Sequence, residues 1–105
     1  MENRTPGGDV NPYLAVAAMI AAGLRGIDRQ LPLEPAFSGN AYADTGARLP
    51  RSLQDALDLW CKSELAREAF GSEVVEHYAN YARTELEAFG SAVTDWELRR
   101  GFERL

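Results

Sequence analysis

A charge-free run near the N-terminus, Tyr13 to Leu24, limits most strongly how this chain can fold. Asn11 and Pro12 precede it and form a helix-start signal, because Asn caps free amides and Pro fits the first helical position. We therefore predict a helix from Pro12 to about Gln30. Its apolar residues form two stripes that leave almost no polar face. Such a helix is normally enclosed by protein, and a chain of 105 residues has too few others to enclose it.

The apolar run does not indicate a membrane segment. A span needs about 20 apolar residues, and the residues ahead of the run, including Gly7, Gly8 and Asp9, are not the basic cluster of a signal peptide. The net charge is -5, with the acidic excess concentrated between Leu53 and Gly90. Neither nucleic acid nor an anionic membrane is therefore expected as a partner.

Few side chains suggest independent chemistry. The single cysteine, Cys61, cannot form an internal disulfide, which favours the cytoplasm, and we interpret it as a partly buried small apolar residue. His77 is the single histidine, so one chain cannot assemble a multi-histidine metal site or a Ser-His-Asp triad. We interpret it as a helix-surface or half-buried imidazole. Two pairs of acids at i, i+3 are interpreted as a solvated face: Asp55 with Asp58, and Glu73 with Glu76.

The rest of the chain is predicted to be helical after a long irregular excursion over Leu31 to Arg51, which contains Pro32 and Pro35. Capping residues and helical spacing predict four more helices: one capped by Ser52, one from Ser63 to Gly71, one from Ser72 to about Val93, and one capped by Thr94 that carries Trp96 inward. Only the first four residues look like a strand. The fold class is thus mainly α, in one domain spanning residues 1–105.

Glu2 and Arg4 are the candidate site residues, since alternate residues of an extended segment point the same way. A carboxylate can bind a hard cation, and a guanidinium can bind phosphate or carboxylate through two hydrogen bonds. From composition alone, an exposed terminal ion pair is the simpler interpretation.

The run ENRTPGGDVNPYLAVAAMIAAGLRGI closely resembles the C-terminal part of the glutamine synthetase family's catalytic domain. Members of that family read much like E-x-R-x-P, then N-P-Y-L-A and A-A-G-L-x-G-I. The segments LPRSLQDAL, FGSEVVEHY and VTDWELRRGFERL follow the same layout. The resemblance covers the whole chain but only about the last quarter of a full member. It implies a C-terminal helical fragment of an α+β catalytic domain, with one residual strand at the N-terminus.

The resemblance also implies an activity. The family joins glutamate to ammonia or another amine at the expense of ATP, through an acyl phosphate. Glu2 matches the glutamate that binds Mg²⁺ or Mn²⁺, and Arg4 matches the arginine that contacts substrate glutamate and the transferred phosphoryl group. The expected partners are glutamate, ATP, an amine, and further copies in a homo-oligomeric ring. The segments FGSEVVEHY and VTDWELRRGFERL look more like the branch that glutamylates larger amines, such as polyamines.

Much of the parent site has no counterpart in these residues, including the other metal ligands and the ATP-contacting segments. We therefore expect the 105 residues alone to be inactive, as a truncated reading frame, a pseudogene remnant or a separately encoded fragment. The alternative is a helical interaction module that docks onto full-length synthetase subunits. Around Tyr42, GNAYADTG differs from the NLYDLP of members that are adenylylated there, so that regulation is not expected.

Overall fold

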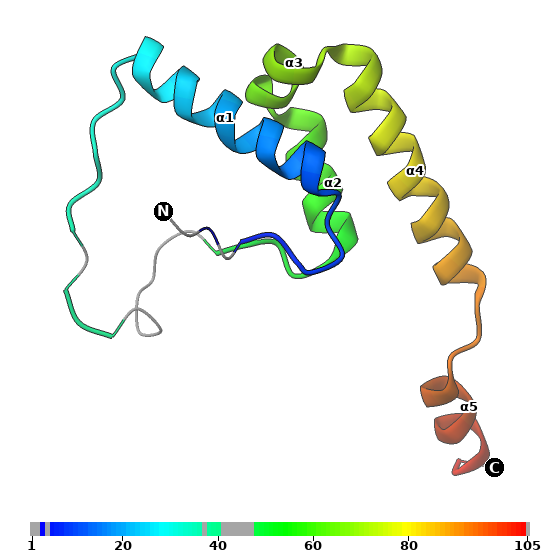
Figure 1. Cartoon of the computed structure of the whole chain (residues 1–105). Helices are drawn as coiled ribbons and strands as arrows, with labels where there is room; N and C mark the ends of the chain where they lie inside the picture. The colour runs from blue at the N-terminus through cyan, green and yellow to red at the C-terminus, as the bar shows by residue number, and fades with distance from the viewer. Residues whose placement is uncertain (1–2, 4, 37, 41–47, 105) are drawn as a thin grey trace.

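The computed structural model describes residues 3, 5–36, 38–40 and 48–104, and it is mainly helical, as predicted. Helices in this part of the chain are α1 (Pro12–Asp28), α2 (Leu53–Lys62), α3 (Glu64–Phe70), α4 (Ser72–Ser91) and α5 (Asp95–Phe102), shown in Figure 1. The described residues contain no strand. The strand predicted for the first four residues falls almost entirely outside them and stays a prediction.

Helix α1 begins where the sequence predicts and ends earlier. The Asn11 side chain accepts hydrogen bonds from the amides of Tyr13 and Leu14, at 3.0 and 3.3 Å. The predicted end at Gln30 is wrong, because Gln30 has a φ of 48° and leaves the helix. Its amide donates to the Ile27 carbonyl, and the next amide donates to the Gly26 carbonyl. This pair of bonds is a Schellman motif, with glutamine in the left-handed position that glycine usually takes.

Helices α2, α3 and α4 form the only substantial core of the described chain. Ser52 caps α2 as predicted, and Ser63, predicted as the start of the next helix, is the N-cap of α3. Each accepts a hydrogen bond of 3.1 Å from a first-turn amide. Gly71 joins α3 to α4 with φ 81° and ψ 158°, a conformation that is essentially restricted to glycine. The predicted end of α4 at Val93 is two residues too late. Buried apolar side chains in the described chain are few: Leu57, Ala66, Val75 and Ala79.

Helix α5 forms its predicted cap but not its predicted packing. Thr94 and Glu97 make both hydrogen bonds of a capping box. The prediction that Trp96 points inward is wrong, because 69% of it is exposed. Figure 1 shows α5 beyond the end of α4 and away from α1, α2 and α3. Within the described chain, α5 therefore has no apolar surface on which to bury its indole.

The helices make an open assembly. The radius of gyration is 18.4 Å, whereas a compact domain of this length would have about 13 Å. The accessible surface is 9489 Å², against about 5,800 Å² expected for a compact chain of this mass. Helix α1, which is described throughout, packs on α3 but has no buried residue. No helix in the described residues is long and apolar enough to cross a membrane.

Candidate functional site

The two residues with predicted chemical roles, Glu2 and Arg4, lie outside the described residues, as does Tyr42. What the structure describes is the loop that follows them. The Asn3 side chain accepts a hydrogen bond of 3.0 Å from the Thr5 amide, and Val10 donates to the Gly7 carbonyl at 3.2 Å. The Asn11 cap then joins this loop to α1. The described part of this loop is thus a short, turn-containing segment that leads directly into a well-formed helix.

The described residues do not supply a metal site by themselves. No three His, Cys, Asp or Glu side chains converge in this part of the chain. Magnesium and calcium need several oxygen ligands, and a single carboxylate does not hold them against water. Glu2, if it binds a divalent ion, therefore needs ligands that the described residues do not provide.

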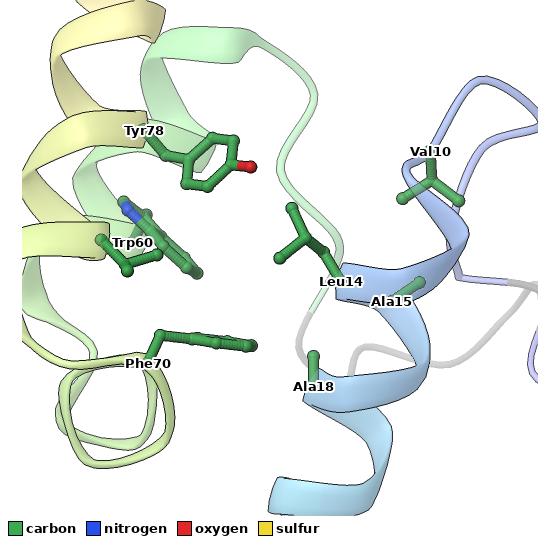
Figure 2. Close-up of a pocket in the computed structure, with 8 residues that line it drawn as sticks. Val10, Leu14, Ala15, Ala18, Trp60, Phe70 and Tyr78 are labelled. Atoms are coloured by element: carbon green, nitrogen blue, oxygen red, sulfur yellow. The ribbon is translucent and has the colours of Figure 1, made fainter.

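An apolar groove with a volume of about 310 Å³ lies between α1 and the helices α2 to α4. Figure 2 shows Leu14 and Ala18 on α1 facing Trp60, Phe70 and Tyr78 across this space. Its lining is almost entirely hydrocarbon: Val10, Leu14, Ala15, Ala18, Trp60, Phe70, Val74 and Tyr78. Val10 belongs to the loop that precedes α1, so this loop contributes to the lining on the α1 side of the groove.

The aromatic wall of the groove is fixed by Trp60. Its indole Nε1 donates a hydrogen bond of 2.9 Å to the Val75 carbonyl, which ties α2 to α4. Its ring lies 6.1 Å from Phe70 and 6.4 Å from Tyr78, the latter edge to face. Such spacings are typical of favourable aromatic pairs. The groove therefore has a preformed wall on the α2–α4 side, opposite the small side chains of α1.

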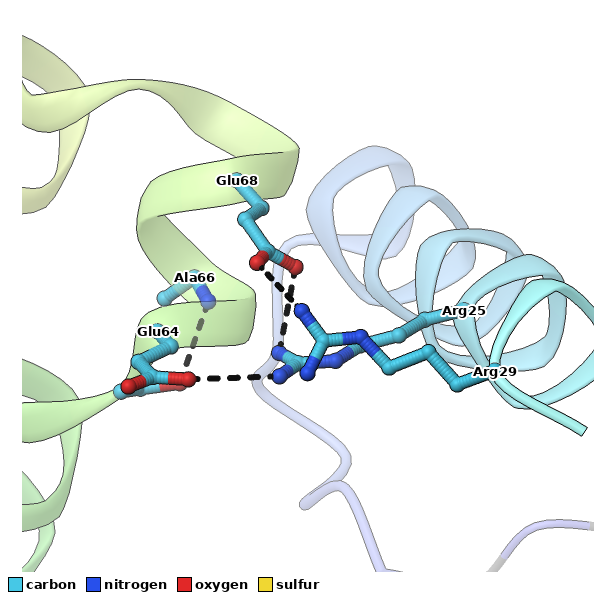
Figure 3. Close-up of polar contacts among 6 residues, drawn as sticks. Arg25, Arg29, Glu64, Ala66 and Glu68 are labelled. Atoms are coloured by element: carbon cyan, nitrogen blue, oxygen red, sulfur yellow. Dashed lines mark hydrogen bonds and ion pairs between the residues drawn. The ribbon is translucent and has the colours of Figure 1, made fainter. Parts of the chain in front are cut away.

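Ion pairs hold α1 on α3 (Figure 3). The Arg29 guanidinium donates to the Glu68 carboxylate at 2.8 Å, and Arg25 lies 3.3 Å from the other Glu68 oxygen. A longer contact of 3.5 Å joins Arg25 to Glu64. Glu68 thus bridges Arg25, in the last turn of α1, and Arg29, the C-cap of this helix. This contact fixes which face of α1 points toward α3.

Sequence reasoning missed this cluster, although a signal was present. Arg25 and Arg29 are four residues apart, and so are Glu64 and Glu68, so each pair lies on one helix face. Opposite charges at equal spacing on two helices indicate a possible contact between them. The groove had no comparable signal, because its walls come from four separate segments.

The remaining candidates behave as interpreted. His77 is exposed on α4, and its ring meets Tyr78 edge to face at 5.3 Å. Cys61 is half-buried, and its carbonyl and thiol accept from Arg67 and Arg83 at 2.8 and 3.8 Å. The paired acids are exposed, which confirms the interpretation of a solvated face: Asp55, Asp58, Glu73 and Glu76. None of these side chains forms a site with the groove.

Comparison with known proteins settles the family. The profile of the glutamine synthetase catalytic domain matches residues 1–101. The chain belongs to the glutamine synthetase family. As a member, it corresponds to the C-terminal part of that catalytic domain.

Individual relatives of this glutamine synthetase segment include enzymes for different amines. It is 61% identical over 104 residues to the γ-glutamylethanolamide synthetase of Streptomyces coelicolor, covering 99% of this chain and 22% of that protein. It is 42% identical to the glutamate–isopropylamine ligase of a Pseudomonas species, covering 95% and 22%. It is 41% identical to type-1 glutamine synthetase 2 of Dictyostelium discoideum, covering 97% and 20%. The chain therefore spans about a fifth of the length of these relatives.

Proposed function

We propose that these residues form the C-terminal helical part of an ATP-dependent ligase that joins the γ-carboxylate of glutamate to an amine. The observation that carries the proposal is the family match over residues 1–101, together with 61% identity to a γ-glutamylethanolamide synthetase. The names of two relatives refer to amines larger than ammonia: one names isopropylamine, and the other names an ethanolamide, the amide that ethanolamine forms. We therefore favour a small organic amine, rather than ammonia, as the second substrate.

The reaction explains why an arginine and a metal-binding carboxylate are expected. A free carboxylate does not react with an amine, because its oxygen is a poor leaving group. Transfer of the γ-phosphoryl group of ATP gives γ-glutamyl phosphate and ADP. The amine then attacks the carbonyl carbon, phosphate leaves, and the amine nitrogen loses a proton. In this scheme Arg4 binds the negative charge of substrate carboxylate and phosphoryl oxygens.

These 105 residues alone are proposed to be inactive. Glu2 would provide one of several ligands to the divalent ion that phosphoryl transfer requires, and the described residues hold no further cluster that could complete the set. Phosphate release from ATP and glutamate, measured on the purified chain with ethanolamine, should equal the rate without protein. Release above that background would contradict this part of the proposal.

A chimera tests the catalytic part. The matching 104 residues of the Streptomyces coelicolor relative are replaced by this chain, and amide formation is measured with ammonia, ethanolamine and putrescine. We expect an active chimera, with Glu2→Gln and Arg4→Ala each lowering kcat/KM by at least about a hundredfold, as for the loss of a group that stabilises transition-state charge. Glu87→Gln, on the exposed face of α4, is the matched control.

The possible outcomes separate cleanly. Glu2→Gln should also raise the Mg²⁺ concentration needed for half-maximal rate, whereas Arg4→Ala should leave it nearly unchanged. A folded chimera without activity would overturn the proposed function. An active chimera that is indifferent to both substitutions would overturn the roles of Glu2 and Arg4 while leaving the family assignment intact.

A further inference from the structure

Helix α1 is supported unevenly along its length. At its C-terminal end, two arginines share the Glu68 carboxylate of α3. The Arg29 guanidinium donates to Oε1 at 2.8 Å, and the Arg25 guanidinium lies 3.3 Å from Oε2 (Figure 3). Because each carboxylate oxygen has its own arginine, these contacts fix a direction as well as a distance. We call these three residues the arginine clasp.

The N-terminal half of α1 has no comparable polar contact to another helix among the residues that the structure describes. Leu14 and Ala18 face the aromatic wall of the groove, across a space of about 310 Å³ (Figure 2). No residue of α1 is buried within the described chain. The helix is therefore held more firmly at the clasp than at the end that begins at Pro12.

The less firmly held end of α1 is continuous with the loop that follows Glu2 and Arg4 in the sequence. The Val10 amide closes a turn on the Gly7 carbonyl at 3.2 Å, and the Asn11 side chain accepts from the first amides of the helix. Turn and cap join the end of the loop to the helix. A rotation of α1 about the clasp therefore carries this part of the loop with it.

The length of α1 turns a small rotation into a large displacement. Arg25 and Asn11 are 14 positions apart, which corresponds to roughly 21 Å along a helix. Over that length, a tilt of about 3° at the clasp moves the far end by about 1 Å. A misplacement of about 1 Å at a reacting centre can lower a rate by about a hundredfold. The clasp is thus placed where a small change has a large effect on the loop.

We propose that Glu68 is a positioning residue of the ligase, which sets the angle of α1 through the arginine clasp and thereby the position from which Arg4 acts. This rests on the proposed function, in which Arg4 binds the substrate carboxylate and the phosphoryl oxygens. Glu68 touches no reacting atom in this scheme. Its effect on the reaction passes through α1 and the loop.

The test uses the chimera with the Streptomyces coelicolor relative, because α1 then lies within a whole catalytic domain. Glu68→Gln keeps the shape of the side chain, which is 50% exposed, and removes its charge. It should lower kcat/KM for glutamate by about tenfold, with a rise in KM of at least about threefold. Glu87→Gln removes the same charge from the exposed face of α4 and should change either constant by less than about twofold.

The KM distinguishes positioning from a loss of folded enzyme. A variant that only folds less well contains fewer active molecules, which lowers the apparent kcat and leaves KM unchanged. A double-mutant cycle adds a second criterion. In the Arg4→Ala background, Glu68→Gln should lower kcat/KM by less than about threefold, because the effects of residues that act as a unit are not additive.

The outcomes separate this proposal from the proposed function. A folded but inactive chimera would overturn both. An active chimera would leave the function standing and would overturn the role of Glu68 in any of three cases. These are a Glu68→Gln variant that behaves like Glu87→Gln, one that lowers kcat at unchanged KM, and one that loses the same factor with and without Arg4.

Discussion

Trp60 is the side chain whose loss should most clearly test the described packing. It joins α2 to α4 through the hydrogen bond of 2.9 Å to the Val75 carbonyl, and it contacts the rings of Phe70 and Tyr78. Trp60→Phe keeps an aromatic ring but removes the indole donor and part of the apolar surface. Trp96→Phe makes the same chemical change at a residue that is 69% exposed. There, the Arg100 guanidinium carbon lies 5.7 Å from the centre of the indole ring.

The expected magnitudes differ because the two environments differ. Loss of the hydrogen bond costs about 1 kcal/mol, and loss of half-buried ring atoms costs about 1 kcal/mol more. Trp60→Phe should therefore lower the free energy of unfolding by about 2 kcal/mol, or roughly thirtyfold in the folding equilibrium. Trp96→Phe should lower it by less than about 0.5 kcal/mol, because cation–π contacts at exposed sites are weak.

The assay is urea denaturation followed by far-ultraviolet circular dichroism, with trimethylamine N-oxide added to strengthen apolar burial in this open chain. Each variant retains one of the two tryptophans, so the fluorescence of Trp96→Phe reports on Trp60 alone. That emission should be blue-shifted when folded and should move to the red on unfolding. Equal destabilisation by both substitutions, or a Trp60→Phe midpoint equal to that of the unmodified chain, would refute the reasoning.

Two further substitutions test the joint between α3 and α4 and the contact between α1 and α3. Gly71→Ala should lower the free energy of unfolding by about 1–3 kcal/mol in the same denaturation assay, because the backbone conformation at Gly71 suits only glycine. Gly23→Ala, inside α1 and with open space around it, should leave the free energy of unfolding unchanged or raise it. Glu68→Gln should weaken the packing of α1 on α3 by about 0.5–1.5 kcal/mol at low salt, measured as faster amide hydrogen exchange in α1, and Glu64→Gln should weaken it by less. High salt should reduce the difference between the two variants, because it screens ion pairs. Equal effects of the two substitutions at low salt, or a difference that persists in high salt, would contradict this.

Local structure was largely predictable from the sequence. Asn11, Ser52 and Thr94 all cap helices as predicted, because a cap depends on hydrogen bonds within three residues. The errors occurred at helix ends and in packing. The end of α1 depends on a glutamine in the left-handed conformation, which residue type does not favour.

The candidate site was predictable only in part. Glu2 and Arg4 were named from their alternation and from the resemblance, and their positions lie outside the described residues. The family itself could be recognised from sequence, since its motifs are contiguous, and the match over residues 1–101 confirms it. The exposure of Trp96 could not be foreseen, because an amphipathic pattern shows which face is apolar without showing what covers it.

The sequence by itself determined where most helices begin, that one of them is apolar almost all round, and which family the chain belongs to. These properties depend on neighbouring residues. Only the tertiary structure decided that Glu68 bridges two arginines 39 and 43 positions earlier in the chain, and that Trp60 ties α2 to α4. It also decided which side of α1 stays uncovered. Such contacts depend on how whole helices meet, which no local pattern of residues specifies.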